Sequence, residues 1–423
     1  MRILIYSYNY HPEPIGIAPL MTELAEGLVK RGHQVRVVTA MPNYPERQIY
    51  PEYRGKFYVN ENINGVQIQR SYVWIRPQPN LLDRVLLDGS FVVTSFFPAF
   101  MGWRPEVILL TSPSLPVCIP ATFLGFLRSC PVVLNLQDIL PEAAVAMGLL
   151  QNKLLIKVFT ALEKFAYASA TKISVITEGF ADNLVAKGVP AQKIVQIPNW
   201  VDVNFIRPLS KEENPFRITH NLKGKFVVLY SGNIALTQGL ETVIHAAAKL
   251  RDIQDIAFVI VGEAKGLQRL QQECLECGAN NVLLLPFQAR QKLPQMYAAA
   301  DVGLVVQKKN VISFNMPSKI QVLLASGRAL VASVPENGTA FKAIQKSGGG
   351  VLVPPEDPQA LATAILDLYQ NPEKVQNLGD KSRQYAVDHY AFEQTLNQYE
   401  TLFKSMRANG TAMKSSIITK QEV

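Results

Sequence analysis

A chain of 423 residues exceeds what a single hydrophobic core usually supports, so its length predicts two domains of about 200 residues each. Only 18% of the residues are charged, and the net charge of +8 comes from scattered lysines and arginines rather than from a basic run, which argues against extended disorder and against a nucleic-acid partner. Four cysteines in a chain of this length exclude a disulfide framework and favour a reducing compartment.

The first half of the chain alternates short β-branched runs with amphipathic stretches, the pattern of a parallel sheet with helices on both faces. No charged segment followed by a long apolar segment precedes the first strand, so we expect no signal peptide and a cytoplasmic location. The predicted strands of this half are residues 3–8, 34–39, 67–72, 107–111, 132–136, 173–176 and 194–197.

The longest uncharged apolar run of the chain covers residues 89–103. Its 15 residues include Pro98, and a membrane-spanning helix needs about 20 residues, so we do not expect a transmembrane segment. Two interpretations remain open: a segment that lies in a membrane interface, or a core helix of the first domain.

The second half repeats the alternation of strands and helices. Residues 205–225 carry two prolines and several charged residues without clean periodicity, which predicts a linker between two domains. The strands predicted after it are residues 226–230, 257–261, 282–285, 302–306, 329–332 and 350–353. We therefore predict an α/β protein made of two Rossmann-like parallel-sheet domains that face a central cleft.

The domain limits that we predict are residues 1–205 for the first domain and 206–390 for the second. Apolar residues at helical spacing, among them Leu396 and Phe403, predict a helix over residues 391–407 that packs back towards the first domain. The polar tail, residues 408–423, is expected to be frayed.

Polar residues follow the first predicted strand. Gly16 lies in the loop after it, where a glycine lets a ligand approach the backbone closely. His11 lies in the same loop and is a candidate base, although a histidine that forms only local hydrogen bonds is equally consistent with the sequence.

The strand predicted over residues 132–136 is followed by Gln137, Asp138 and Glu142. A carboxylate and an amide at the carboxyl edge of a strand can orient an acceptor hydroxyl or take its proton. Asp138 can equally cap a helix that begins near Pro141, and the spacing favours neither interpretation.

The second domain opens with a strand, a glycine-bearing loop and an amphipathic helix. Gly232, Asn233 and Gln238 lie in this loop, whose geometry suits a diphosphate, and Glu263 follows the next strand. The loop lacks the G-x-x-x-x-G-K-[ST] pattern, so we do not expect an NTPase.

Pro317 and Ser318 predict the start of a further helix. Free N–H groups there, together with the ammonium group of Lys319, form a candidate anion site. The alternative is that Lys319 is an ordinary surface lysine. Cys274 and Cys277 form a single C-x-x-C pair, and no second pair or nearby histidine completes a zinc site, so we expect no metal.

Five of these segments together resemble the family 4 retaining glycosyltransferases of the GT-B fold, especially the bacterial exopolysaccharide branch typified by colanic acid biosynthesis enzymes. The resemblance runs from residue 1 to about residue 406. The segments that carry it, in the order and spacing of the family, are residues 10–16, 137–142, 197–202, 231–241 and 317–328.

The resemblance implies transfer of a sugar from a nucleoside-diphosphate sugar to a hydroxyl, with retention at the anomeric carbon and with no metal or other cofactor. It places the acceptor on residues 1–205 and the donor mainly on residues 206–390, and it implies catalytic roles for Asp138, Gln137 and Lys319. The acceptor is expected to be a lipid-linked or other saccharide. The enzyme is expected to make peripheral contact with the inner membrane. The substrate-binding residues that it implies are Gly16, His11, Glu142, Gly232, Asn233, Gln238, Glu263 and Ser318.

The chain departs from the family pattern at several positions. In many relatives an arginine and a lysine occupy the places of Asn233 and Gln238, and we interpret Lys319 as the replacement cation. Two glutamates common in the family align with Phe314 and Val322, so the usual carboxylate for the donor ribose is missing.

Two alternative functions remain consistent with the sequence. A sugar-nucleotide epimerase of the same architecture needs no acceptor, although the motifs offer few carboxylates for it. A nucleotide-sugar-binding protein with weak or no turnover is the second alternative, because of Phe314 and Val322.

Overall fold

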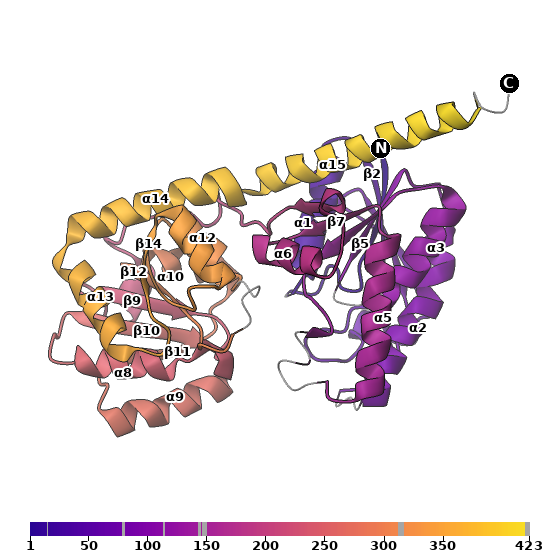
Figure 1. The fold of residues 1–423 in the computed structure, drawn as a ribbon. Helices are drawn as coiled ribbons and strands as arrows, with labels where there is room; N and C mark the ends of the chain where they lie inside the picture. Colours follow the sequence, from indigo (N-terminus) through magenta and orange to yellow (C-terminus); the bar gives the residue numbers. More distant parts are fainter. Residues whose placement is uncertain are drawn as a thin grey trace. The chain divides into compact units, whose positions relative to one another are not determined.

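The computed structural model describes residues 1–14, 16–77, 81–112, 115–142, 145, 150–311 and 317–418; of residues 81, 82, 84 and 408–418 it describes the backbone alone. The chain divides into two compact units (Figure 1). Unit 1 comprises Met1–Asn199 and the segment from Thr395 onward, and unit 2 comprises Trp200–Gln394. Each unit contains its own sheet with a buried core, which confirms the predicted pair of α/β domains.

The described part of unit 1 contains an eight-stranded sheet in the order β3-β4-β2-β1-β5-β6-β7-β8. All neighbouring strands pair in parallel except β3 and β4. Every residue of β5 and β6 is buried, as expected for strands covered on both faces. The strands are β1 (Arg2–Tyr6), β2 (Gln34–Ala40), β3 (Tyr58–Ile63), β4 (Val66–Ser71), β5 (Val107–Thr111), β6 (Val132–Leu136), β7 (Lys172–Val175) and β8 (Ile194–Gln196).

Strand β3 is an edge strand that the sequence analysis missed. It pairs antiparallel with β4 through a turn at Asn64 and Gly65, whose φ angles are 51° and 83°. Asn-Gly is the preferred pair for a two-residue hairpin turn, because both positions need a positive φ. This dipeptide was the available signal, and none of the β3 residues is buried as a central strand would be.

Helices α2, α3 and α5 lie together, while α1 and α6 lie elsewhere around the sheet (Figure 1). Helix α2 buries Phe91 and Ala99 in unit 1 and exposes Val93 and Phe97, so it is a core helix with an exposed apolar side. Among the described helices, none combines the length and the apolar character that crossing a bilayer requires. The helices before the carboxyl-terminal segment are α1 (Ala18–Lys30), α2 (Leu81–Phe100), α3 (Cys118–Arg128), α5 (Lys153–Ser169) and α6 (Glu178–Ala186), with short 3-10 turns η1 (Pro51–Tyr53), η2 (Leu115–Val117) and η3 (Ala191–Lys193).

Unit 2 contains a six-stranded sheet in the order β11-β10-β9-β12-β13-β14, in which all pairs are parallel. The strands are β9 (Phe226–Ser231), β10 (Ile256–Gly262), β11 (Val282–Pro286), β12 (Val302–Val306), β13 (Ala329–Ser333) and β14 (Gly350–Val353). The helices are α7 (Pro215–Thr219), α8 (Glu241–Lys249), α9 (Ala264–Cys277), α10 (Leu293–Ala298), α11 (Lys319–Ala325), α12 (Thr339–Ser347), α13 (Pro358–Gln370) and α14 (Pro372–Tyr390), with η4 (Leu236–Gln238) and η5 (Arg290–Lys292). Each strand predicted for this half coincides with an observed strand to within one residue at either end.

Residues 205–225 are not a loose linker, and that prediction was wrong. Phe216 and Arg217 of α7 are buried in unit 2, where Phe216 belongs to a hydrophobic core cluster. The side chain of Asn214 caps α7 by accepting hydrogen bonds from the N–H groups of Phe216 and Arg217. Arg217, one of the charged residues that suggested a linker, is instead buried in unit 2.

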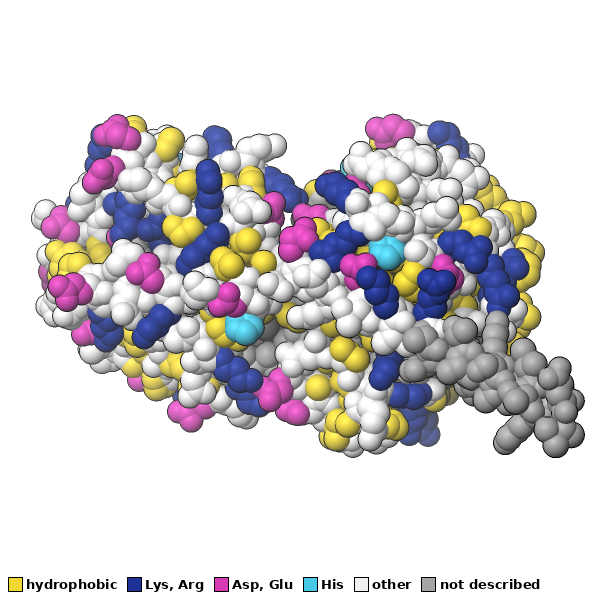
Figure 2. All heavy atoms as spheres, turned by 90° about the horizontal axis from the view of Figure 1, so that it is seen from above, with side chains coloured by type: hydrophobic (Ala, Val, Ile, Leu, Met, Phe, Trp, Pro, Cys, Tyr) yellow, Lys and Arg dark blue, Asp and Glu magenta, His cyan; other side chains and the backbone are white. Residues whose placement is uncertain are grey.

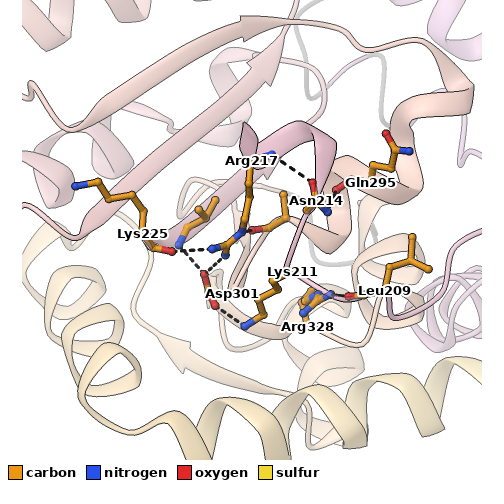
Figure 3. A network of polar contacts seen from close by, with 10 residues as sticks. Leu209, Lys211, Asn214, Arg217, Lys225, Gln295, Asp301 and Arg328 are labelled. Carbon is orange, nitrogen blue, oxygen red and sulfur yellow. Dashed lines mark hydrogen bonds and ion pairs between the residues drawn. The ribbon is translucent and has the colours of Figure 1, made fainter. Parts of the chain in front are cut away.

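Asp301 explains why this segment packs (Figure 3). Its Oδ2 atom accepts a hydrogen bond from Arg217 Nη2 at 2.6 Å and another from the N–H of Val227 at 2.8 Å. Lys211 forms a further ion pair with Oδ1, and Arg217 Nε donates to the carbonyl of Ala299. A buried carboxylate that is satisfied in this way ties the start of unit 2 to its central strands.

Helix α15 (Phe392–Ile418) follows α14, and from Thr395 onward it belongs to unit 1. Its buried face includes Tyr399, whose hydroxyl accepts a hydrogen bond from Asn135 Nδ2 at 2.7 Å. Glu400 pairs with Arg31 at 2.9 Å, and cationic hydrogen-bond partners, Lys404 first and then Arg31, lower the pKa of Glu400 to about 2. The helix thus completes unit 1 with residues from the far end of the chain.

Candidate functional site

The carboxyl ends of β9, β10 and β12 lie side by side, because β9 pairs in parallel with both of the other strands. Gly232, Glu263 and Gln307 are the residues that follow these strands. Open parallel sheets bind ligands at this edge, where the N–H groups of the loops point away from the sheet. The predicted donor-site residues of unit 2 therefore gather at one edge.

Gly232 and Lys319 occupy adjoining space. Gly232 has a φ of +145°, a conformation that favours glycine. A Cβ atom at this position would lie 3.0 Å from Lys319 Nζ and 3.2 Å from Lys319 Cε. The lysine side chain therefore fills the room that a side chain at position 232 would need, and the two predicted segments lie together.

The ammonium nitrogen of Lys319 is buried and has no hydrogen-bond acceptor among the described residues. It lies 3.5 Å from the centre of the Tyr230 ring, whose face attracts a cation. Burial lowers the pKa of Lys319 from 10.5 to about 7, and the carboxylate of Glu263 opposes this shift in part. Because an unpaired buried cation is costly, this position is suited to an incoming anion.

Glu263 holds the loop after β9. Both of its carboxylate oxygens accept from the N–H of Ile234, at 3.0 Å and 2.9 Å. The Ile234 side chain packs where Cβ atoms at Gly262 and Gly266 would lie, 2.5 Å and 2.4 Å from its nearest carbons. The structure thus gives Glu263 a role in shaping the backbone beside Lys319.

The remaining predicted residues of unit 2 differ in exposure. Asn233 is exposed and its carbonyl accepts from the hydroxyl of Tyr230 at 2.6 Å, while Ser318 is exposed and its side chain caps no N–H group of α11. Gln238 lies in η4, and its buried Oε1 atom has no partner among the described residues.

Two glutamines that the sequence analysis missed share this property. The side chains of Gln307, after β12, and Gln321, on α11, are buried, and each has one polar atom without a partner among the described residues. Buried polar atoms are usually paired, and Gln307 follows β12 directly, so its unpaired atom indicates room for a polar ligand at this edge of the sheet. No local sequence signal distinguishes these glutamines, because only the fold buries their side chains.

The structure describes one of the two positions that lack the family glutamates. Val322 lies on α11 and packs against the hydrophobic core of unit 2. Phe314 lies outside the described residues.

In unit 1, the side chain of Gln137 is engaged in a polar network. Its Nε2 atom donates to Asn135 Oδ1 at 2.8 Å and to Asn199 Oδ1 at 3.1 Å. Its Oε1 atom accepts from Asn199 Nδ2 at 2.8 Å, and Asn135 continues the network to Tyr399 of α15. The amide of Gln137 therefore connects the end of β6 with the end of unit 1.

Asp138, the next residue, is exposed, and its carboxylate forms no hydrogen bond with another described residue. Partial desolvation by the surrounding protein raises the pKa of the Asp138 carboxyl. The alternative role as a helix cap is not seen among the described residues, since none of their N–H groups donates to the Asp138 carboxylate. An unpaired carboxylate with a raised pKa is suited to hold a hydroxyl or to exchange a proton with it.

Glu142 lies towards α6 rather than in a free position. It accepts from Asn183 Nδ2 at 3.0 Å and forms an ion pair with Lys187 at 3.2 Å. Together with Glu163, it lines a cavity of about 540 Å³ between α5 and residues 187–193, which follow α6.

The loop after β1 contains His11, Glu13 and Gly16. The ring of His11 is exposed, whereas its N–H and carbonyl groups bond to Thr22 and Arg70. Gly16 has a φ of +72°, and no atom lies within 4 Å of where its Cβ would be. Glu13 was not predicted as a site residue: it is buried, and its Oε1 atom accepts from two N–H groups of the loop after β2, so it holds these two loops together.

Comparisons with known proteins agree with these observations. The family model described as "Glycosyl transferase 4-like domain" matches residues 16–200, and the one described as "Glycosyl transferases group 1" matches residues 210–385. The chain is 32% identical over 408 residues to the Escherichia coli (strain K12) protein named "Putative colanic acid biosynthesis glycosyl transferase WcaI", covering 94% of this chain and 98% of that protein. It is 27% identical over 268 residues to "Probable glycosyltransferase WbjE" of Pseudomonas aeruginosa, covering 62% of this chain and 64% of that protein.

Two solved structures show the same fold. Anabaena HepE, solved in complex with UDP, matches with a TM-score of 0.73 at 17% identity, covering 96% of this chain and 100% of that chain. Sucrose-phosphate synthase from Thermosynechococcus elongatus matches with a TM-score of 0.72 at 18% identity, covering 97% of this chain and 100% of that chain. The family resemblance predicted from the motifs is confirmed: the chain belongs to the family 4 glycosyltransferases of the GT-B fold.

Proposed function

We propose that this glycosyltransferase transfers a sugar, with retention, from a nucleoside-diphosphate sugar bound in unit 2 to a hydroxyl of a lipid-linked saccharide acceptor bound in unit 1. The observation that carries the donor assignment is the ammonium group of Lys319, which is buried beside Gly232 and has no hydrogen-bond partner among the residues that the structure describes. The UDP present in the HepE complex supports a nucleotide donor. The name of the E. coli relative supports a role in surface polysaccharide synthesis.

Negative charge develops on the departing diphosphate in this reaction, and catalysis depends mainly on stabilising that charge. Lys319 is held in place by burial and by the Tyr230 ring, so it needs little reorganisation as that charge appears. Preorganised groups of this kind supply the largest stabilisation of many transition states. Lys319 thus takes the role of leaving-group cation, and the reaction requires no metal ion.

The acceptor side needs a group that orients a hydroxyl. Asp138 offers a carboxylate at the end of β6 that no described residue pairs with, while its neighbour Gln137 is held by Asn135 and Asn199. We assign Asp138 to the acceptor hydroxyl and Gln137 to the support of the loop that carries Asp138. Because the acceptor is lipid-linked, the enzyme works at the cytoplasmic face of the membrane.

The test measures release of nucleoside diphosphate by the purified chain with a panel of UDP- and GDP-sugars, with and without a polyprenyl-linked saccharide. We expect faster release with one donor when the acceptor is present. Lys319→Ala is expected to remove this release, and Lys265→Ala, at an exposed lysine of α9, serves as the matched control. Absence of acceptor-dependent release across the panel, or isomerised nucleotide sugar without acceptor, would contradict the proposal.

A further inference from the structure

Helices α2, α3 and α5 carry many exposed apolar side chains. The helices contact one another in sequence, α2 with α3 and α3 with α5, and they lie side by side in Figure 1. In Figure 2, hydrophobic side chains and lysine or arginine side chains gather along the right-hand rim of the view. We call this region the α2–α3–α5 face; its exposed apolar residues are Val85, Leu86, Val93, Phe97, Phe100, Met101, Ile119, Phe123, Phe126, Leu127, Leu154, Val158 and Phe165.

Helix α3 shows the pattern most clearly. Its exposed residues Ile119, Phe123, Phe126 and Leu127 follow helical spacing, and Phe126 is 80% exposed. The opposite side of the helix is buried against the sheet, where a Cβ at Gly125 would lie 2.7 Å from Val132. A surface helix normally carries polar residues on its outer side, so an apolar outer side indicates a surface that is covered in use.

The exposed charges that α3 and α5 contribute to this face have one sign, whereas α2 also carries Asp88 and Asp83, which forms an ion pair with Arg76 at 3.8 Å. The charged residues of α3 and α5 that reach the surface are Arg128, Lys153, Lys157 and Lys164. The single acidic residue of these two helices, Glu163, is buried and bonded to Tyr167 and Lys187. None of the three lysines pairs with a carboxylate of a described residue.

A second group of cations lies at the end of α2. Arg128 donates to the carbonyl of Phe100 at 2.8 Å, Arg104 donates to the carbonyl of Arg128 at 2.7 Å, and Arg36 donates to the carbonyl of Ala99 at 3.2 Å. Arg36 is buried, and its Nε and Nη1 atoms have no partner among the described residues. Burial, together with the charge of Arg128, lowers the pKa of Arg36 to about 10. The end of α2 is thus a cationic region that no described carboxylate neutralises by an ion pair.

We infer that the α2–α3–α5 face docks on a membrane surface of anionic phospholipid. Phe97 and Phe126 enter the boundary between headgroups and acyl chains, and Lys153, Lys157 and Arg128 lie against the lipid phosphates. The inference rests on the proposed function for its biological sense, because a lipid-linked acceptor is presented at such a surface. The substrate site in unit 2 takes no part in it.

The positive charge of α3 and α5 favours a lipid surface over a second copy of this chain. A symmetric dimer brings the same patch of both subunits together, so its lysines would face lysines. Anionic lipid instead attracts each of them, and one lysine near such a surface contributes about fivefold in affinity.

The test uses the full chain and vesicles of two compositions, phosphatidylcholine alone and phosphatidylcholine with phosphatidylglycerol in equal parts. We expect co-sedimentation with the anionic vesicles, little with the neutral ones, and loss of binding as salt is raised. The double variant Lys153→Gln/Lys157→Gln is expected to bind about 25-fold more weakly, at about fivefold for each lysine. The double variant Phe97→Ser/Phe126→Ser is expected to lose about tenfold or more.

Matched controls separate this face from general surface chemistry. Val185→Ser on α6 and Lys265→Gln on α9 alter exposed residues elsewhere and are expected to bind vesicles normally. Equal binding to both vesicle types, or unchanged binding by the two double variants, would overturn the inference. A concentration-dependent dimer in light scattering that Phe126→Ser abolishes would overturn it in favour of self-association.

Donor binding distinguishes this inference from the proposed function. The α2–α3–α5 face lies in unit 1 and Lys319 in unit 2, so the face variants are expected to bind UDP as the unchanged protein does. Vesicle binding without any sugar transfer would leave this inference intact and contradict the proposed function. Transfer to a short acceptor without vesicle binding would contradict this inference and leave the proposed function intact.

Discussion

The two strand-end regions of this protein handle their polar groups in different ways. At the edge of the unit-2 sheet, Lys319, Gln238 and Gln307 have buried atoms without partners among the described residues. At the end of β6 in unit 1, the side chain of Gln137 is fully hydrogen-bonded, and its neighbour Asp138 has no hydrogen-bond partner in the described part of the chain. Unpaired polar groups at a sheet edge can bind a charged ligand, whereas a network of paired groups keeps the local structure rigid.

The largest effect is expected from removing the unpaired cation. Lys319→Ala is expected to lower kcat by about 100-fold or more, because one preorganised electrostatic group is lost. Steady-state kinetics with the donor identified by the panel would measure it, with Lys265→Ala as the control. A near-normal rate would show that another group stabilises the diphosphate.

A smaller effect is expected at the end of β6. Asp138→Asn is expected to lower kcat by about tenfold or more, since an amide neither takes a proton nor orients a hydroxyl as a carboxylate does. Calorimetric titration with the nucleotide should show an unchanged Kd. Collapse of donor affinity in this variant would mean that Asp138 has a structural role.

Gln137→Leu should affect stability more than turnover. The substitution leaves the amide groups of Asn135 and Asn199 without their partner, so we expect the free energy of unfolding to fall by about 1–3 kcal/mol. Urea denaturation would measure this loss, and Gln192→Leu, at an exposed position, is the control. Unchanged stability together with lost turnover would instead place Gln137 in the reaction.

The smallest expected effect is the uptake of a fraction of one proton when the nucleotide binds. Above about pH 7 Lys319 is mostly neutral in the unliganded protein, and a bound diphosphate raises its pKa again, so nucleotide binding is expected to take up protons there. Calorimetry in buffers of different ionisation enthalpy would detect this uptake, and Lys319→Ala should abolish it. For the same reason, the free energy of unfolding of the unliganded protein should rise between about pH 7 and 10.5, where the unfolded chain binds the additional proton. An equal uptake in both proteins would show that Lys319 is already charged.

Strands were the most predictable part of the fold. Strands β5 and β6 are buried at every residue, and their continuous apolar runs predicted both of them correctly. The edge strand β3 was missed because its outer position leaves no such run, although Asn64-Gly65 marks its turn. The segment before β9 was misread as a linker, because charged residues such as Arg217 find their partner Asp301 only after folding.

What the sequence alone determined is the family and the order of its elements, since apolar periodicity and ordered motifs are local properties of the chain. The tertiary structure decided which of the motif residues have side chains that other residues do not already bind. It places Lys319 against Gly232, ties Gln137 to Asn199, and leaves Phe126 exposed, because contacts between residues far apart in the chain form only when the sheets assemble.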